Sequence, residues 1–422
     1  MELFGQKNTI GNKIKKLQNF PLMKYSLIQG VGAELEPVVN VGDKVKCATI
    51  IAKCKENFLG ANLHSSTSGE VVKIVREEID KNCNANVVYI KSDDKNECEK
   101  PLEALNEIDL QSLCDRLNDC GVIGCGDGGF PFAVKLEKFK NGGLKHCFID
   151  CACSDAFYTA DISVLMERSN KVIRAIQIIK EATNCDSFIV VARRGMKRRF
   201  LSEFIMQIAD KSHIYYCEIA NKLCVGGDCN ISNKILGLNL TNDDVLTDYG
   251  FICTDVQTLC ALTDAVDYGL PMTSKVITCG GGAIAEPCNV DVKIGSLYED
   301  IVDAVGGEKF ALYKYESLEQ KAKDSYLSYL DLRDEFKEDE TDEEVKKDMV
   351  EMRKQSNHDI LEFLKAEKMY KNVIRQSIIC GGGICGEEKT SLEFGVTKSS
   401  QAILLLNKGE SKKIAKMRKK NK

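Results

Sequence analysis

The feature that most constrains the fold is an alternation of short apolar stretches with longer amphipathic segments in the middle of the chain. Residues 187-SFIVVAR-193 form a continuous apolar run of strand length. The preceding segment, 163-SVLMERSNKVIRAIQIIKEAT-183, has apolar residues at spacings of three and four, which indicates a helix. The same succession continues with strand-like stretches at 146–152 and 214–220 and a helix-like stretch at 201–210. Strands that alternate with helices predict a parallel sheet covered by helices, so the expected fold class is α/β.

Segments of different character flank this region. Residues 21–92 contain short strand-like pieces punctuated by Gly42 and Gly69, which predicts a small all-β module. Residues 308–372 are highly charged with apolar residues at helical spacing, which predicts a solvated helical insertion. The other predicted parts are an N-terminal segment (1–20), the α/β domain (105–245), a module that mixes a helix with strands (246–307), a return to apolar strands (373–408) and a basic, frayed tail (409–422).

Composition limits the compartment and the partners. The net charge of −5 gives no general attraction to nucleic acid or to an anionic membrane. No apolar run is long enough to span a bilayer, and the N-terminus lacks the pattern of a secretory signal. We therefore expect a soluble, cytoplasmic protein with no membrane span and no nucleic-acid partner. The twenty cysteines are too few for a disulfide-stapled scaffold, and no Cys-x-x-Cys motif predicts a zinc or iron–sulfur site.

The glycine-rich stretch 121-GVIGCGDGGFPFAVKL-136 is the strongest candidate for a ligand site. Glycine lets the backbone approach a flat or anionic group closely. The stretch follows a helix-like segment, 109-DLQSLCDRLNDCG-121, and its glycines run G-x-G-x-G-G, so the dinucleotide-binding fingerprint is not met. No Walker Lys-Ser/Thr pair occurs in it either. The pattern alone therefore leaves a ligand site and a plain turn equally open.

Several collinear blocks resemble the RnfC-like family of the Rnf electron-transport complex, which shares its flavin domain with the NADH-binding subunit of respiratory complex I. The family's loop, GxxGxGGAGFPTxxKL, is similar to residues 121–136. The other similar blocks, in the family's order, are LIQGVGAELEPVVNVGDKVK, LHSSTSGEVVKI, TADISVLMER, CVGGDCNISNKILG, CTDVQTLCALTDAV, VITCGGGAIAEPCNVDVKIG and IICGGGICG. The resemblance covers the chain outside 308–372 and both tails. It implies a flavin-binding α/β domain of the complex I type, a biotinyl-lipoyl-like barrel sandwich at 21–92 and a soluble-ligand-binding β-grasp module at 246–307.

The resemblance also implies an FMN site, with NADH as a possible electron donor. It places the flavin and its phosphate along the backbone of the glycine-rich stretch, with a lysine as the charge partner of the phosphate. The implied cofactor-binding residues are Gly124, Gly126, Gly128, Gly129, Lys135, Asp150, Asp155, Thr254, Asp255, Val256 and Thr258.

Three departures from the family pattern bear on these cofactors. Where the family reads Asn-Gly-x-Glu-x-Glu-Pro, this chain reads 150-DCACSDAFY-158, so Asp150 replaces an asparagine and Cys153 replaces a glutamate on the nicotinamide side. Asp255 replaces the asparagine of the family's Asn-Val block. Each added carboxylate would repel a phosphate unless it is protonated or turned away. The chain also ends where the family's two ferredoxin-type clusters would begin, so electrons would have to leave by another route.

Cysteine pairs are the other candidate electron carriers. The candidate redox-active, catalytic cysteines are the pairs Cys120/Cys125, Cys224/Cys229, Cys380/Cys385 and Cys151/Cys153. Thiols near amide-rich loops can have a lowered pKa and form reversible disulfides. The alternative is that cysteine replaces small apolar residues throughout the chain. We expect that simpler role for Cys47, Cys54, Cys185, Cys217, Cys260 and Cys279.

Two functional hypotheses of different classes remain open. The first is a soluble electron-transfer protein that passes NADH-derived electrons through a flavin or the cysteines to a partner reductase, as in the family branch associated with D-proline reductase. The second is a flavin-free family member that serves as a scaffold or docking subunit of a reductase complex. The glycine-rich stretch and Lys135 favour the first hypothesis, and Asp150 and Asp255 favour the second. We take the first as the leading hypothesis.

Overall fold

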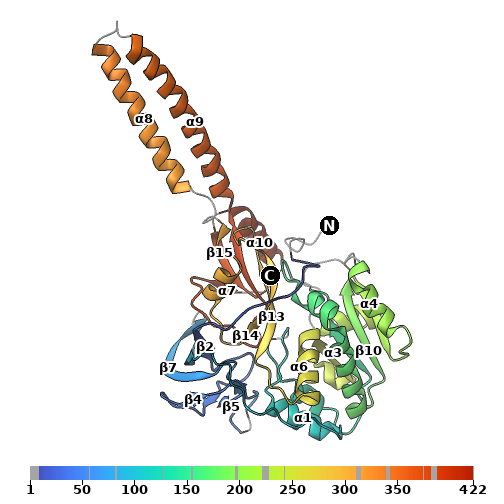
Figure 1. The fold of residues 1–422 in the computed structure, drawn as a ribbon. Helices are drawn as coiled ribbons and strands as arrows, with labels where there is room; N and C mark the ends of the chain where they lie inside the picture. Colours follow the sequence, from blue (N-terminus) through green and yellow to red (C-terminus); the bar gives the residue numbers. More distant parts are fainter. Residues whose placement is uncertain are drawn as a thin grey trace.

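The structure is a computed structural model of the 422-residue chain. The residues that it describes are 9–56, 58–80, 83–126, 128–153, 155–194, 198–220, 228–241, 243–309, 315–338, 343–373, 375–381 and 387–421. They form a body of three packed parts and a helical arm that projects from it (Figure 1).

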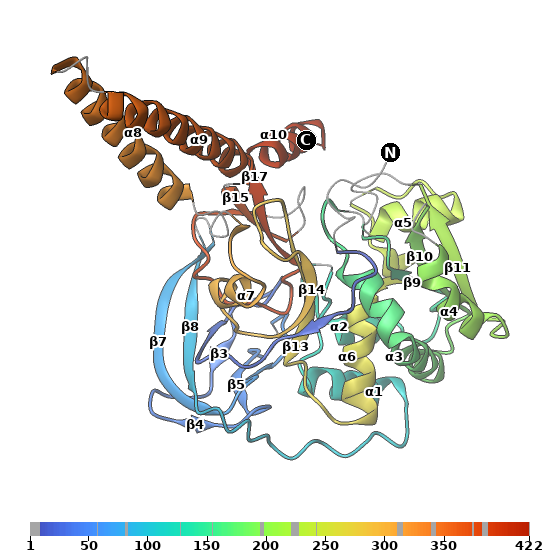
Figure 2. The same cartoon turned by 45° about the horizontal axis from the view of Figure 1, so that its top comes forward.

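The first part is an α/β layer around a four-stranded parallel sheet with the strand order β11-β10-β9-β12. Every residue of β10 is buried, as its continuous apolar sequence requires. Helices α1, α3 and α6 pack on one face of the sheet, and α5 packs on the other (Figures 1 and 2). The elements of the layer are α1 (Leu110–Asp119), α2 (Phe132–Glu137), β9 (His146–Asp150), α3 (Ala160–Thr183), β10 (Ser187–Arg193), α4 (Arg198–Ile208), β11 (Ile214–Ile219), α5 (Asp228–Leu236), η2 (Leu246–Tyr249), β12 (Phe251–Asp255) and α6 (Val256–Asp267).

The second part is a small β barrel built from two sheets that enclose their own apolar core. The four-stranded sheet has the order β2-β8-β7-β4, and the three-stranded sheet has the order β3-β5-β6. The long strands β7 and β8 form its outer hairpin (Figure 2). The strands are β2 (Leu22–Ser26), β3 (Glu36–Pro37), β4 (Lys44–Val45), β5 (Ile50–Lys53), β6 (Leu63–His64), β7 (Gly69–Asp80) and β8 (Cys83–Ser92).

The third part is a six-stranded mixed sheet with the order β1-β14-β13-β17-β15-β16. It joins strands from both ends of the chain, because β1 pairs with β14 and β17 pairs with β13. Its elements are β1 (Lys15–Lys16), β13 (Ser274–Gly280), β14 (Cys288–Lys293), α7 (Tyr298–Ala304), β15 (Arg375–Cys380), β16 (Glu387–Lys389), β17 (Ala402–Asn407) and α10 (Lys408–Asn421).

Two features differ from the sequence-based expectations. Strand β12 pairs with β9, and α6 packs on α3, so residues 251–267 extend the α/β layer beyond the expected boundary at 245. The basic tail is not frayed: it forms α10, whose Ile414 is buried in the core because its apolar side packs on the sheet.

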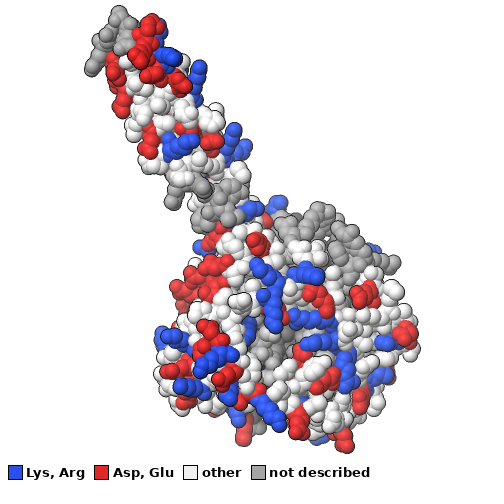
Figure 3. Space-filling view, viewed as in Figure 1, with Lys and Arg blue, Asp and Glu red and all other residues white. Residues whose placement is uncertain are grey.

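The arm is an antiparallel pair of long helices, α8 (Tyr315–Glu338) and α9 (Glu343–Val373), inserted before β15. On the face shown in Figure 3, acidic and basic side chains are interspersed over both the arm and the body. In the part of the chain that the structure describes, no helix is both long enough and apolar enough to cross a membrane.

Candidate functional site

Three segments meet at the carboxyl edge of the parallel sheet. The chain runs from β9 through β10 to β11 and then places β12 on the other side of β9, so the strand order reverses between β9 and β12. Ligands of open α/β sheets bind outside the carboxyl ends of the strands at such a reversal. The segments at this point are the loop after β9 (residues 151–159), the N-terminus of α6 and residues 121–131, which we call the glycine loop.

Asp255 joins the glycine loop to α6. Its Oδ1 accepts hydrogen bonds from the amides of Gln257 and Thr258, both at 2.9 Å, and thereby caps the helix. Its Oδ2 accepts from the amides of Cys125 and Gly126, at 3.0 and 3.1 Å, and from the Thr258 hydroxyl at 2.6 Å. A carboxylate of the chain itself therefore takes two of the amides that the sequence assigns to a ligand.

Gly128 and Gly129 make the contact between the glycine loop and the barrel. The Val31 amide donates to the Gly128 carbonyl at 2.7 Å. A Cβ on Gly30 would lie 2.5 Å from both the Gly128 oxygen and the Gly129 Cα, so only glycine fits there. Gly128 and Gly129 themselves have φ values of +64° and +78°, which glycine adopts without strain. These glycines are explained by the close approach of two backbones, whereas Gly124 is buried and bonded within the loop.

Gly126 is the part of the glycine loop that offers open backbone. It is exposed, and the nearest neighbours of a Cβ placed on it would be side-chain atoms of Asp255 and Gln401, at 3.5 and 3.6 Å. The Gly126 carbonyl accepts a hydrogen bond from Gln401 at 2.9 Å. Because Gly126 is exposed, its backbone is open to the close approach of a flat group.

Two polar side chains lie at the end of β12. The Thr254 hydroxyl is buried and has no hydrogen-bond partner among the residues described, which is unusual for a buried polar group. The Lys135 ammonium donates to the Cys253 carbonyl at 3.1 Å, which brings a positive charge to the same strand end. Val256, also predicted from the sequence, is fully buried in the apolar core and offers a ligand no side chain.

The loop after β9 is closed by a buried arginine. Arg193, at the end of β10, is fully buried and donates to the carbonyls of Ala152 and Cys153. Cys153 and Phe157 have φ values of +44° and +67°, which are uncommon for residues other than glycine. A residue keeps such a conformation only where surrounding contacts stabilise it. The hydrogen bonds from Arg193 are among the contacts that stabilise this loop.

Both predicted acids of this loop bond to nearby backbone. Asp150 accepts from the Ala152 amide at 2.8 Å, and Asp155 accepts from the Ala156 amide at 2.5 Å. Asp150 also lies opposite Asp255 in the register of β9 and β12. The structure therefore brings together the two carboxylates that depart from the family pattern.

A third carboxylate, Asp161 near the start of α3, was missed in the sequence. It accepts hydrogen bonds from the Tyr158 hydroxyl at 2.7 Å and from the Gln257 amide group at 2.9 Å. Burial, with a further contribution from Asp255, raises the pKa of Asp161 to about 7. Its position in a helical apolar pattern gave no signal, because one of its partners, Gln257, comes from α6, which is distant in sequence.

Two buried lysines lie beneath the glycine loop and were also missed. Lys398 is fully buried and donates to the carbonyls of Gly121 and Asn62, at 2.6 and 2.7 Å, so it ties the loop to the barrel. Burial lowers the pKa of Lys398 to about 7. Lys275, from β13, donates to the Cys125 carbonyl at 3.3 Å. The underside of the loop is thus fixed by cations that sequence position alone does not identify.

The predicted redox cysteines do not have the lowered thiol pKa values that a redox role was expected to require. Burial raises the pKa of the Cys120 thiol to about 11 and those of Cys125 and Cys380 to about 12, and it raises the pKa values of Cys151 and Cys153 well above the usual range. The prediction of lowered pKa values is therefore wrong for these five thiols. The cause is enclosure in apolar surroundings, which disfavours the thiolate.

The expected pairing differs as well. Cys120 packs in the core of the α/β layer, whereas Cys125 packs in the core of the barrel. Cys224, Cys385 and the side chain of Cys229 lie outside the described residues. Within the described part of the chain, no three metal-ligating side chains form a group that could hold a metal ion.

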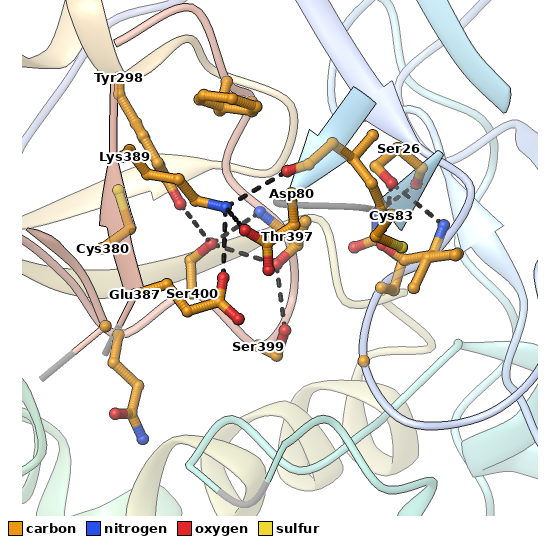
Figure 4. A pocket seen from close by; sticks show the side chains of 18 of the residues that line it. Ser26, Asp80, Cys83, Tyr298, Cys380, Glu387, Lys389, Thr397, Ser399 and Ser400 are labelled. Carbon is orange, nitrogen blue, oxygen red and sulfur yellow. Dashed lines mark hydrogen bonds and ion pairs between the residues drawn. The ribbon is translucent and has the colours of Figure 1, made fainter. Parts of the chain in front are cut away.

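A cavity of about 520 Å³ lies between the barrel, the glycine loop and the six-stranded sheet. Gly126 and Gly128 reach it from one side, and Cys380 and Tyr298 from the other. Figure 4 shows Lys389 beside it, paired with Asp80 at 2.6 Å and with Glu387 at 3.2 Å. This volume is in the range of small-molecule sites, and its lining mixes apolar side chains with polar groups, of which Lys389, Asp80 and Glu387 are paired with one another.

Comparison with known proteins finds family matches for two of the three parts, the barrel and the α/β layer. Residues 3–95 match the RnfC barrel sandwich hybrid domain, and residues 117–264 match the Nuo51 FMN-binding domain. The predicted resemblance to the RnfC-like family and the predicted α/β fold with an N-terminal barrel sandwich are thereby confirmed. The second match ends within α6, in agreement with the place of β12 and α6 in the parallel sheet.

Two curated relatives belong to named complexes. The chain is 28% identical, over 67% of its length, to a subunit of the proton-translocating ferredoxin:NAD(+) oxidoreductase complex of Clostridium ljungdahlii. It is 21% identical, over 66% of its length, to a subunit of the Na(+)-translocating ferredoxin:NAD(+) oxidoreductase complex of Acetobacterium woodii. The matches span 62% and 63% of those relatives. A solved NAD+-reducing [NiFe]-hydrogenase, in the H2-reduced state, overlaps 48% of this chain and 40% of its own at a TM-score of 0.41 and 14% identity, too low to carry an argument.

Proposed function

We propose that this chain, which carries an RnfC barrel sandwich hybrid domain and a Nuo51 FMN-binding domain, is an electron-transfer subunit that binds FMN. The observation that carries the proposal is the meeting of the glycine loop, the loop after β9 and the N-terminus of α6 at the strand-order reversal between β9 and β12. In the proposal, NADH supplies the electrons and a partner reductase, of the type that proline reductase represents, receives them.

The described residues fit FMN at this edge. Gly126 would lie against the ring system, the unpartnered hydroxyl of Thr254 would bond to the ligand, and Lys135 would offset the charge of its phosphate. Bound FMN would supply the capacity to take two electrons from a nicotinamide and to pass them on singly. The chain's own residues would hold it, because Lys275 and Lys398 bond to the carbonyls of Cys125 and Gly121 and so fix the loop before any ligand arrives.

Asp255 sets a condition on this proposal. Its carboxylate already accepts from the amides of Cys125 and Gly126, and an FMN phosphate placed there would meet an anion. We therefore propose that the phosphate lies on the side of Lys135 and away from Asp255. In this arrangement Asp255 acts as an internal anion that shapes the glycine loop.

The proposal is tested by adding FMN to the purified chain and following the flavin absorbance under anaerobic conditions. We expect one FMN to remain with each chain through gel filtration and its absorbance to fall when NADH is added. A chain that retains FMN and is not reduced by NADH would remove NADH as donor and leave the flavin site intact. A folded chain that retains no FMN would contradict the proposal.

A second candidate function is a flavin-free docking subunit of a reductase complex. It is favoured by the occupation of two loop amides by Asp255 and by the burial of the thiols that would otherwise carry electrons. Under this alternative the chain binds its partner reductase equally well with or without added FMN, which a pull-down with the purified partner would measure.

A further inference from the structure

A pair of cysteines lies on the surface of the barrel, far from the glycine loop in sequence. Cys47 and Cys98 are directly opposite each other in an isolated parallel bridge. The Cys47 amide donates to the Glu97 carbonyl, and the Glu99 amide donates to the Cys47 carbonyl, both at 2.8 Å. These two bonds flank Cys98 and fix the register of the pair. Paired positions on neighbouring strands lie about 5 Å apart, which is within the Cα separation that a disulfide spans.

Independent contacts hold both sides of the bridge in place. Cys47 lies in the tight turn 46–49, in which the Thr49 amide donates to the Lys46 carbonyl at 3.1 Å and Ala48 has a φ of +73°. On the other side, the Glu97 amide donates to the Ser68 hydroxyl at 3.1 Å. The pairing is thus set by the fold of the barrel and does not depend on the thiols themselves.

The two thiols differ in access, which gives them different roles. Cys98 is exposed to solvent, whereas Cys47 is partly buried behind it. Burial, with Cys98 as the next contribution, raises the pKa of Cys47 to about 11, so this thiol is protonated at neutral pH and is not the first to react. The Lys293 ammonium, which lies beside the pair, favours the thiolate of Cys47 and so opposes this shift. Cys279 and Cys288 also face each other, across β13 and β14, but Cys279 is fully buried and out of reach of an oxidant.

We propose that Cys47 and Cys98 form a reversible disulfide, a thiol-oxidation site that fastens the connector after β8 to the barrel. The oxidant is a small-molecule disulfide. The Cys98 thiolate attacks one of its sulfur atoms, the sulfur–sulfur bond breaks, and one thiol leaves with a proton. Cys47 then loses its proton to solvent and attacks the Cys98 sulfur, which releases the second thiol. Two protein thiols are oxidised, and one small disulfide is reduced to two thiols.

The site differs from the cysteine pairs predicted from the sequence. The sequence predicts that Cys47 is a small apolar residue, and Cys98 belongs to no predicted pair. Nothing in their sequence spacing joins them, because the intervening residues form four barrel strands, β5 to β8. The bond would close a covalent loop around those strands and fix the start of the segment that leads to α1. It would act on the junction of two parts of the molecule and not on the flavin site.

The test is oxidation of the full-length, reduced chain with oxidised glutathione, followed by alkylation and peptide mass mapping. We expect a peptide pair joined through Cys47 and Cys98, which dithiothreitol separates. In C47S the glutathione should stay on Cys98 and persist at least about tenfold longer, because the intramolecular thiol that displaces it is gone. C98S should lose the joined peptides and leave Cys47 unmodified. C83S, which removes another partly buried cysteine of the barrel, should form the joined peptides as the wild type does.

Two results would overturn the proposal. One is a glutathione adduct on Cys98 that lasts as long in the wild type as in C47S. The other is an oxidised wild type whose Cys47 remains fully open to alkylation after unfolding. The second result is read on the wild type alone, so it does not depend on how any variant folds.

Discussion

At the scale of single residues, Asp255 combines two functions in one carboxylate. It caps α6 through one oxygen and holds the glycine loop through the other. The asparagine of the family pattern offers a single acceptor oxygen, so it cannot make both sets of bonds in the same way. In the sequence, this departure from the family pattern is an unfavourable negative charge. In the structure, the same carboxylate connects α6 to the glycine loop.

We expect Asp255→Asn to weaken the fold and strengthen FMN binding. Loss of one acceptor for the loop amides should lower the free energy of unfolding by about 1–2 kcal/mol. Removal of this distant negative charge should tighten FMN by no more than about threefold, because the phosphate is proposed to lie away from Asp255. Denaturant titration and flavin fluorescence measure the two effects. Asp109→Asn is the matched control: Asp109 caps α1 in the same manner, far from the loop, and its replacement should leave FMN affinity unchanged. A gain in FMN affinity of about tenfold or more in Asp255→Asn would contradict this placement, because it would put the phosphate against Asp255 in the wild type.

Asp161 should give the stability a distinctive pH dependence. Its pKa is raised from 3.8 to about 7, by burial first and by Asp255 second. Between these values the folded chain keeps a proton that the unfolded chain releases, so the stability from this group is full at low pH and is lost as pH rises toward about 7. The slope should be roughly 1.4 kcal/mol per pH unit. Unfolding at several pH values, compared with Asp161→Asn, isolates the effect. Parallel pH profiles for the two proteins would refute it.

At the scale of elements, the contact between the barrel and the glycine loop explains glycines that resemble a ligand motif. Gly30, Gly128 and Gly129 let the two backbones touch, and Lys398 bonds to a carbonyl on each side of this junction. A glycine pattern in a sequence can therefore report a close approach between parts of one chain as readily as the approach of a cofactor.

A pair of alanine substitutions separates these two roles. In Gly30→Ala the new methyl group would overlap backbone atoms of Gly128 and Gly129, and we expect a loss of about 1–3 kcal/mol in unfolding free energy. In Gly126→Ala the methyl group finds ordinary contacts, so stability should change by no more than about 0.5 kcal/mol. Thermal and denaturant unfolding provide the comparison. Equal stability of the two variants would mean that the barrel does not press on the loop as described.

The sequence predicted the elements whose signal is local. The all-apolar run of β10 and the helical spacing of α3 were both recognisable, and so was α1 before the glycine loop. It did not predict the place of β12 and α6, because a strand that returns to the far side of a sheet looks like any other strand. Lysine is usually a surface residue, so the sequence gives no sign that Lys398 is buried. Its burial follows from the packing of the three parts of the body around it. The same limit applies to the thiols, whose pKa values depend on enclosure and not on neighbouring sequence.

At the scale of the whole molecule, the three parts of the body meet around the carboxyl edge of the parallel sheet. The barrel presses on the glycine loop, the α/β layer supplies the strand ends, and the six-stranded sheet closes the cavity of about 520 Å³ on the remaining side. The arm of α8 and α9 extends away from this edge (Figure 1). A ligand held by the folded edge and not by the unfolded chain should raise the stability of the body.

The most direct test of the account is an FMN titration of the wild type beside Gly126→Ala, with unfolding measured on both. We expect the wild type to quench the fluorescence of one equivalent of FMN. We expect Gly126→Ala to keep wild-type stability and to bind FMN at least about tenfold more weakly, because its methyl group would stand between the loop backbone and the flavin. Equal FMN affinity in the two proteins, or no binding by the folded wild type, would contradict the assignment of this edge as the flavin site.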